Sequence, residues 1–95
     1  MNDKLKNEET MLLFNALLSL ENIDECINLF DDLCTINEIK SMAQRIEVAS
    51  LLKAGMSYND IVKKTGASSA TISRVNRCLH YGSDGYNLVL ERLGK

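Results

Sequence analysis

Several residue types are scarce or absent in this 95-residue chain. There is no proline and only 5 glycines occur, so few positions interrupt a helix. Aromatic residues make up 5% of the sequence, which argues against a stacking surface for single-stranded nucleic acid. No apolar run is long enough to span a membrane, and residues 1–9 are too polar for a signal peptide. These features predict a cytoplasmic protein.

Residues suited to catalysis or metal binding are also few. The chain has one histidine, His80, and it contains no glycine-rich phosphate loop, HExxH sequence or nucleophile motif. Its three cysteines, Cys26, Cys34 and Cys78, form no CxxC pair, and only Cys78 lies close to a histidine. We therefore expect no enzyme activity, no metal and no cofactor. The cysteines are interpreted as small, buried or half-buried residues in a reducing compartment.

Charge is distributed unevenly along the chain. Residues 1–38 hold two lysines and nine acids, a net charge of −7, whereas residues 39–80 hold seven basic and two acidic residues, a net charge of +5. Salt screens charges beyond about 8–10 Å, so an acidic region elsewhere does not prevent a local basic surface from attracting phosphate. The contrast favours a functional basic surface in residues 39–80, the alternative being ordinary solvated charge on helices.

Apolar periodicity and capping signals predict six helices and no sheet. The expected helices cover residues 8–20, 22–33, 36–54, 57 to the turn at 66, 69–79 and 86–93. The first helix is apolar on more than one side, so in so short a chain it must be covered, and another copy of the protein is the obvious cover. The predicted buried face of the second helix consists of Ile23, Cys26, Ile27, Phe30 and Leu33.

Residues 56–79, MSYNDIVKKTGASSATISRVNRCL, predict two short helices joined by a tight turn. Ser57 and Asp60 have the spacing of a capping box, and Ile61 with Val62 would form the apolar side of the first helix. Gly66 stands at the turn, where glycine takes a left-handed backbone at little cost.

The second of these helices has two contrasting faces. Ile72, Val75 and Leu79 would be buried, and Ser68 or Ser69 would cap its start. Small and hydroxylated residues followed by arginines suit a helix that enters a DNA major groove. The exposed face would carry Ser69, Ala70, Thr71, Ser73, Arg74 and Arg77. The pattern predicts a helix-turn-helix with a recognition helix at Ser69–Leu79, although simple packing of two helices has the same spacing.

The run from Cys34 to Leu79 resembles the tryptophan repressor superfamily, most closely its YerC/YecD-type members. The resemblance rests on Gly55-Met56-Ser57, Gly66-Ala67 and Ala70-Thr71-Ile72-Ser73-Arg74, and the ending GSDGYNLVLERL is also similar to the YerC/YecD type. It implies an all-α, six-helix Trp-repressor-like domain over residues 1–95 that forms an intertwined homodimer. The implied parts are dimerisation helices at 8–54, the helix-turn-helix at 56–79 and a C-terminal helix at 86–93.

The resemblance also implies a sequence-specific regulator of transcription, by expectation a repressor, that binds a palindromic double-stranded DNA operator. Asn59 replaces a base-reading arginine of the repressor, so a different sequence preference is expected. The implied DNA contacts are Asn59, Ser68, Ser69, Ala70, Thr71, Ser73, Arg74 and Arg77. The alternative function is a dimeric protein–protein interaction module with a repurposed helix-turn-helix.

A ligand pocket between the long helix and the recognition helix is implied as well. Its counterparts here are Thr35, Arg45, Thr71, Arg74, Val75 and Cys78. Val75 stands where the repressor has a glycine beside the ligand's indole, and Cys78 replaces a serine. Because an isopropyl group would occupy part of the indole's space, tryptophan is not the expected effector. Either a smaller molecule binds, or side chains fill the pocket and no ligand regulates DNA binding.

Overall fold

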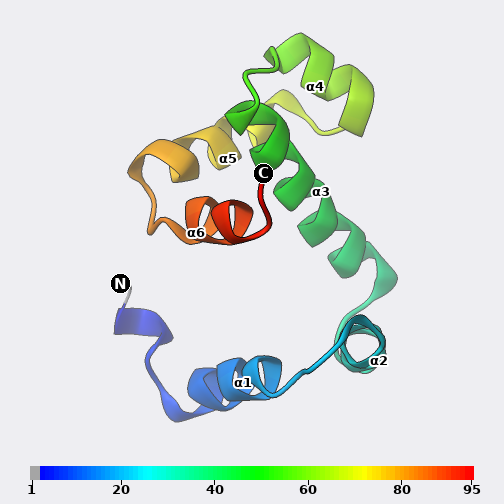
Figure 1. Cartoon of the computed structure of the whole chain (residues 1–95), viewed down its shortest axis with the longest axis vertical. Helices are drawn as coiled ribbons and strands as arrows, with labels where there is room; N and C mark the ends of the chain where they lie inside the picture. The colour runs from blue at the N-terminus through cyan, green and yellow to red at the C-terminus, as the bar shows by residue number, and fades with distance from the viewer. Residues whose placement is uncertain (1–2) are drawn as a thin grey trace. The chain divides into compact units, whose positions relative to one another are not determined.

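The computed structural model describes residues 3–95, and over these residues the protein is entirely helical (Figure 1). A short 3-10 turn at Asp3–Leu5 precedes the α-helices. These are α1 (Glu8–Leu18), α2 (Ile23–Leu33), α3 (Ile36–Lys53), α4 (Tyr58–Thr65), α5 (Ser69–Tyr81) and α6 (Gly85–Arg92). The prediction of six helices and no sheet is confirmed for the described residues. Among the helices described, none is both long and apolar enough to cross a membrane.

Serine side chains cap α4 and α5, as the sequence predicts. Ser57 Oγ accepts a hydrogen bond from the Asp60 N–H at 3.2 Å, and Ser68 Oγ accepts one from the Thr71 N–H at 3.1 Å. Each bond satisfies an N–H group that has no partner inside the helix. The caps therefore determine where the two helices of residues 56–79 begin.

Two helix ends differ from the prediction by two residues. α1 ends two residues early, at Leu18, because Ser19 tightens its last turn: the Ser19 N–H and hydroxyl both donate to the Ala16 carbonyl. α5 continues through His80 to Tyr81, since the interruption comes from Gly82. A Cβ at Gly82 would clash with the Cys78 carbonyl oxygen, so glycine permits the close reversal there.

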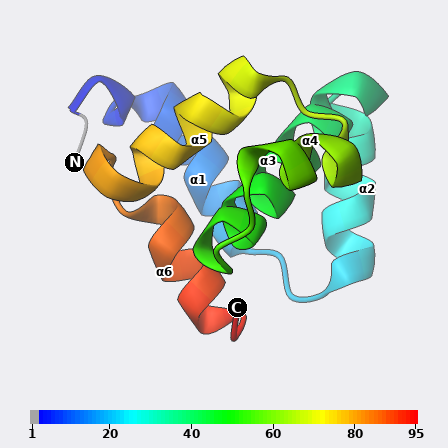
Figure 2. The ribbon, with the colours of Figure 1, turned by 90° about the horizontal axis from the view of Figure 1, so that it is seen from above.

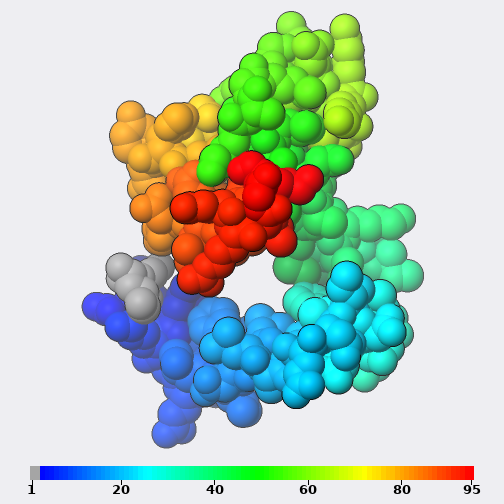
Figure 3. Space-filling view, viewed as in Figure 1, coloured from blue at the N-terminus to red at the C-terminus, as the bar shows by residue number. Residues whose placement is uncertain are grey.

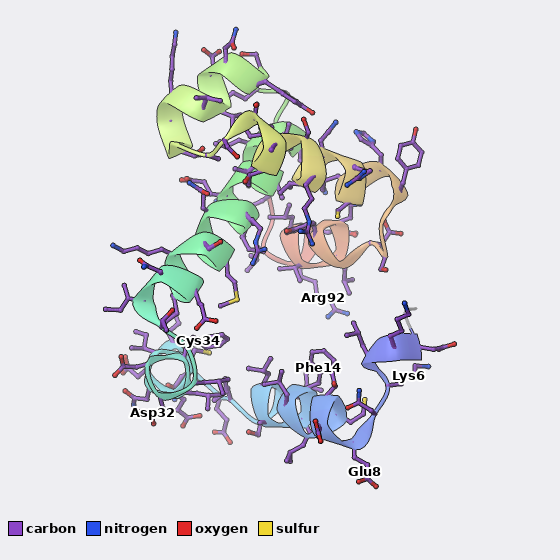
Figure 4. The ribbon with its side chains drawn as sticks, turned by 180° about the vertical axis from the view of Figure 1, so that it is seen from behind. Lys6, Glu8, Phe14, Asp32, Cys34 and Arg92 are labelled. Atoms are coloured by element: carbon purple, nitrogen blue, oxygen red, sulfur yellow. The ribbon has the colours of Figure 1, made fainter. Side chains whose placement is uncertain are left out.

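The chain forms two compact units, residues 1–39 and 40–95, with the boundary in the first turn of α3. In the first unit, neither α1 nor α2 contains a fully buried residue. Phe14 and Glu8 project from opposite sides of α1 (Figure 4). The predicted buried face of α2 is not covered by this chain, because Ile23, Ile27 and Leu33 are exposed and only Cys26 and Phe30 are half-buried.

The second unit contains the hydrophobic core. α4, α5 and α6 gather around the C-terminal half of α3 (Figure 1), and the atoms of α6 lie directly against those of α3 (Figure 3). Half-buried residues, including Leu51, Leu52 and Tyr86, pack around this core. The fully buried residues are Val48, Ala49, Ile61, Ala67, Ile72, Val75 and Leu90.

Burial on α4 and α5 is narrower than the sequence predicts. Ile61 is fully buried but Val62 is 39% exposed, so of the two residues on the predicted apolar side of α4 only Ile61 reaches the core. Consecutive helical residues point about 100° apart, and so short a helix turns only one row toward the core. On α5, Ile72 and Val75 are buried as predicted, whereas Leu79 is half-buried at the edge of the core.

We expect Gly66→Ala to destabilise the protein by about 1–2 kcal/mol, because Gly66 has a left-handed φ of 73°. A Cβ there would meet no atom within 4 Å, so the cost is that of the backbone alone. Gly85→Ala is the matched control: it also adds a Cβ in open space, but without a positive φ, and should be neutral or slightly stabilising. Urea unfolding at equal protein concentrations measures both, and equal losses would contradict the account.

Candidate nucleic-acid interface

The turn between α4 and α5 can be followed in Figure 2, and its two central residues are Gly66 and Ala67. Gly66 ends α4 in the left-handed conformation, and its N–H donates to the Val62 carbonyl at 2.9 Å. Ala67 follows at 2% exposure and joins the hydrophobic core. The turn is thus anchored by a buried methyl group, which holds the start of α5 next to the core.

The side chain of Thr65 forms hydrogen bonds with residues on both sides of this turn. Its hydroxyl donates to the Ile61 carbonyl at 2.7 Å and accepts a bond from the Ala67 N–H at 3.1 Å. The Thr65 carbonyl in turn accepts a bond from Gln44 Nε2 of α3 at 3.2 Å. These bonds connect the end of α4, the start of the turn and the long helix, so the placement of the helix-turn-helix on α3 depends on polar contacts as well as apolar packing.

The contacts of Thr65 and Gln44 are not among the sequence predictions. A threonine at the end of a helix can bond its hydroxyl to the carbonyl four residues earlier, and this spacing was a signal available for Thr65. Gln44 carries no such signal, because its partner lies 21 residues away in the sequence. Only the packing of α4 against α3 brings the two together.

Most of the residues predicted to contact DNA are exposed to solvent. Asn59 is exposed in the first turn of α4, and Ser68 is exposed at the N-cap of α5. On α5 itself, Thr71 is half-buried. The remaining members, all exposed, are Ser69, Ala70, Ser73, Arg74 and Arg77. All of these residues except Thr71 are thus accessible to solvent; that these side chains contact DNA stays a prediction.

A hydrogen bond joins the hydroxyl groups of Ser68 and Thr71. Ser68 Oγ donates to Thr71 Oγ1 at 3.1 Å while accepting the Thr71 N–H. The Thr71 hydroxyl is thereby oriented, and its own hydrogen remains available to donate. Ser73, which is exposed, has no such constraint. Of the two hydroxyl groups, that of Thr71 is therefore the more restricted in orientation.

The residues predicted to form an effector pocket lie in different environments. Val75 is 1% exposed and belongs to the hydrophobic core. Arg45 and Cys78 are half-buried, whereas Arg74 is exposed. The isopropyl group of Val75 is therefore covered by this chain's own atoms. An effector site formed by these residues stays a prediction.

Thr35, the remaining member of that set, lies in the first unit at the N-cap of α3. Its hydroxyl accepts the Glu38 N–H at 3.1 Å, and its N–H donates to the Glu38 carboxylate at 2.8 Å. The backbone N–H and then the hydroxyl of Thr35 hold the pKa of the Glu38 carboxyl below its usual value. This is the predicted Thr-x-x-Glu capping box, so the Thr35 side chain has a structural role at the start of α3.

All three cysteines are free and half-buried, as the sequence predicts. Across residues 3–95, no group of three or more histidine, cysteine or acidic side chains is arranged to hold a metal ion.

The unit with the helix-turn-helix, residues 40–95, carries nine basic and four acidic residues, a net charge of +5. The exposed polar face of α5 lies in this basic unit.

A helix-turn-helix held on an all-helical scaffold is characteristic of DNA-binding regulators. The sequence matches the Trp repressor protein family over residues 8–94, so the chain belongs to that family. The predicted family resemblance is confirmed.

Individual relatives agree with this assignment. A Bacillus subtilis protein, "Uncharacterized protein YerC", is 57% identical over 91 residues, which cover 96% of this chain and 88% of that protein. The crystal structure of a TrpR-like protein from Eubacterium eligens matches with a TM-score of 0.94 and 58% identity, covering 98% of this chain and 96% of that one. A Staphylococcus aureus structure matches with a TM-score of 0.93 and 48% identity, covering 99% and 95%.

We expect Thr65→Val to destabilise the protein by about 1–3 kcal/mol, because the substitution keeps the side-chain volume but leaves the Ala67 N–H without its partner. Thr65→Ser is the control, since it keeps the hydroxyl and should retain more of the stability. Urea unfolding of both variants measures the difference. A valine variant as stable as the serine variant would show that the hydroxyl does not hold the turn.

Proposed function

We propose that this protein is a dimeric, sequence-specific regulator of transcription, by expectation a repressor, that acts in the cytoplasm. Its helix-turn-helix binds double-stranded DNA, with α5 as the recognition helix. The observation that carries the proposal is the division of α5 into two faces: Ile72 and Val75 are buried, while small polar residues and two arginines are exposed. A helix of this kind can place its exposed face in a major groove while its buried face remains packed against the hydrophobic core.

The proposed contacts divide into two kinds. Asn59, Ser69, Ala70, Thr71 and Ser73 are short enough to approach base edges, where amide and hydroxyl groups form hydrogen bonds and the alanine methyl group can contact a thymine methyl group. Arg77 lies one turn beyond Arg74 and is a phosphate contact in this proposal, while Ser68 positions the start of α5. The net charge of +5 on residues 40–95 supports attraction of the phosphate backbone to this unit.

The apolar side chains of α1 and α2 support a homodimer. Leu12 is 73% exposed, Leu18 is 83% exposed and Ile23 is 76% exposed, and such residues on consecutive helices are costly to leave in water. Membership of the Trp repressor protein family agrees with cover by a second copy. A two-fold dimer would present two copies of α5, so we expect a palindromic operator with half-sites one helical turn apart.

The alternative is a dimeric protein–protein interaction module in which the exposed face of α5 binds another protein. The acidic first unit, with a net charge of −7 over residues 1–39, favours a basic partner in that case. The two functions differ in their dependence on salt, because neutralising several DNA phosphates releases counterions.

Selection from random DNA duplexes tests the function directly. We expect enrichment of a palindrome, and a steep loss of affinity between about 50 and 200 mM salt. If no palindrome is enriched even at low salt, the DNA-binding function is wrong and the interaction module takes its place.

Arg77→Ala should weaken binding to all DNA sequences by a similar factor and reduce the salt dependence by about one phosphate contact. Arg92→Ala is the control, because it removes the same charge from α6, outside the proposed DNA-binding surface. Fluorescence anisotropy with the selected operator and a scrambled duplex measures both variants. A loss confined to the operator would show that Arg77 reads bases.

Thr71→Ala should change the preferred base at one operator position, because the oriented hydroxyl is lost from the groove-facing start of α5. Thr71→Ser keeps the hydroxyl and should retain the original preference. Repeating the selection with each variant measures the change. An alanine variant that binds every sequence more weakly, with unchanged preference, would place Thr71 away from the base edges.

A further inference from the structure

The first two residues of the inward face of α5, Ile72 and Val75, are covered by this chain's own atoms, whereas Leu79 at the end of that face is half-buried. Ile72 is 0% exposed and Val75 is 1% exposed, and both share one buried cluster with Val48 and Ala49 of α3. Because Ala49 has only a methyl group, it leaves room in this cluster for the branched side chain of Val75. That side chain has one strongly preferred rotamer in a helix. Protein interiors packed in this way leave few spaces larger than a water molecule. The core therefore fills the space beneath α5 with side chains.

Every helix of the second unit contributes to this cluster. Ile61 comes from α4, Ala67 from the turn and Leu90 from α6, in addition to the residues of α3 and α5. A shift of α5 would separate its two buried residues from partners on several elements at once. Because packed cores have discrete arrangements and do not deform continuously, one orientation of α5 is favoured.

Hydrogen bonds hold both ends of α5 in addition to this packing. At its start, Gln44 of α3 and the Thr65 hydroxyl hold the preceding turn. At its end, Asn87 Nδ2 of α6 donates to the Leu79 carbonyl at 2.9 Å and to Asp84 Oδ1 at 3.0 Å. The helix is thus connected to α3 at one end and to α6 at the other, with no group from outside the chain.

We propose that the chain's own side chains hold α5 in its DNA-binding orientation, with Val75 as a positioning residue, and that DNA binding requires no small-molecule effector. This inference rests on the proposed function. A ligand shifts an equilibrium only to the extent that it binds two states differently. Because α5 already adopts its favoured orientation, an effector bound beneath the helix would not raise the population of that orientation. Of the two possibilities left by the sequence, the structure therefore favours the pocket filled by side chains.

The first experiment removes any ligand that purifies with the protein. The full chain is unfolded in guanidinium chloride, dialysed exhaustively and refolded, and its affinity for the selected operator is measured by fluorescence anisotropy. We expect the affinity to equal that of the untreated protein within about threefold. Adding L-tryptophan, a mixture of the other amino acids, or a deproteinised bacterial extract should leave it unchanged.

A loss of affinity of about tenfold or more that any of these additions reverses would establish an effector and overturn the inference. The proposed function is judged separately, because it fails only when untreated protein enriches no operator. A refolded protein whose circular dichroism differs from that of the untreated protein is replaced by native protein dialysed with charcoal, and the same criteria apply.

The second experiment tests the role of Val75. Val75→Gly should lower operator affinity by about tenfold or more at a temperature where circular dichroism shows a folded protein, because the side chain that supports α5 is gone. His80→Gly is the matched control: His80 is exposed on the same helix, so it adds glycine flexibility without opening the core, and its affinity should stay within about threefold.

If Val75→Gly does not fold, Val75→Ala and His80→Ala replace the pair with the same readout. A folded Val75 variant whose affinity lies as close to the wild type as that of its control would show that another group positions α5. That outcome overturns the inference about Val75 and leaves DNA binding itself intact.

Discussion

The burial of Ile72 and Val75 in one cluster with residues of α3 is the contact on which the arrangement of residues 40–95 depends. It gives α5 a buried face and an exposed face. The short polar residues and the arginines lie on the exposed face. The same cluster takes in Ile61, Ala67 and Leu90, so α4, the turn and α6 are all held through it. Apolar burial supplies the stability, while Thr65, Gln44 and Asn87 supply direction through hydrogen bonds.

The two units of the chain solve different physical problems. Residues 40–95 bury their own apolar residues and present a basic polar surface, whereas α1 and α2 bury none completely and are strongly acidic. An acidic unit with exposed apolar side chains is poorly suited to phosphate but well suited to a protein partner. In the function proposed here, the first unit assembles the dimer, and its negative charge limits non-specific attachment to DNA.

Local signals predicted most of the fold correctly. The caps at Ser57, Ser68 and Thr35 each join atoms three residues apart, and Gly66 adopts the left-handed backbone expected at a turn. Predictions that depended on which neighbours cover a residue were less accurate. Val62 resembles Ile61 in chemistry but lies 39% exposed beside it, and the apolar face of α2 is not covered within the chain.

The sequence by itself determined the six helices, the caps at Ser57, Ser68 and Thr35, the turn at Gly66 and the family, because these depend on residues close in the chain or on matched motifs. Only the tertiary structure decided which groups hold α5 in place. Gln44 meets Thr65 across 21 residues, and Val75 is enclosed by residues from several helices. Long-range contacts of this kind follow from packing in three dimensions, which no local spacing encodes. The burial of Val75 was predicted from the sequence, but its neighbours in the core are known only from the tertiary structure.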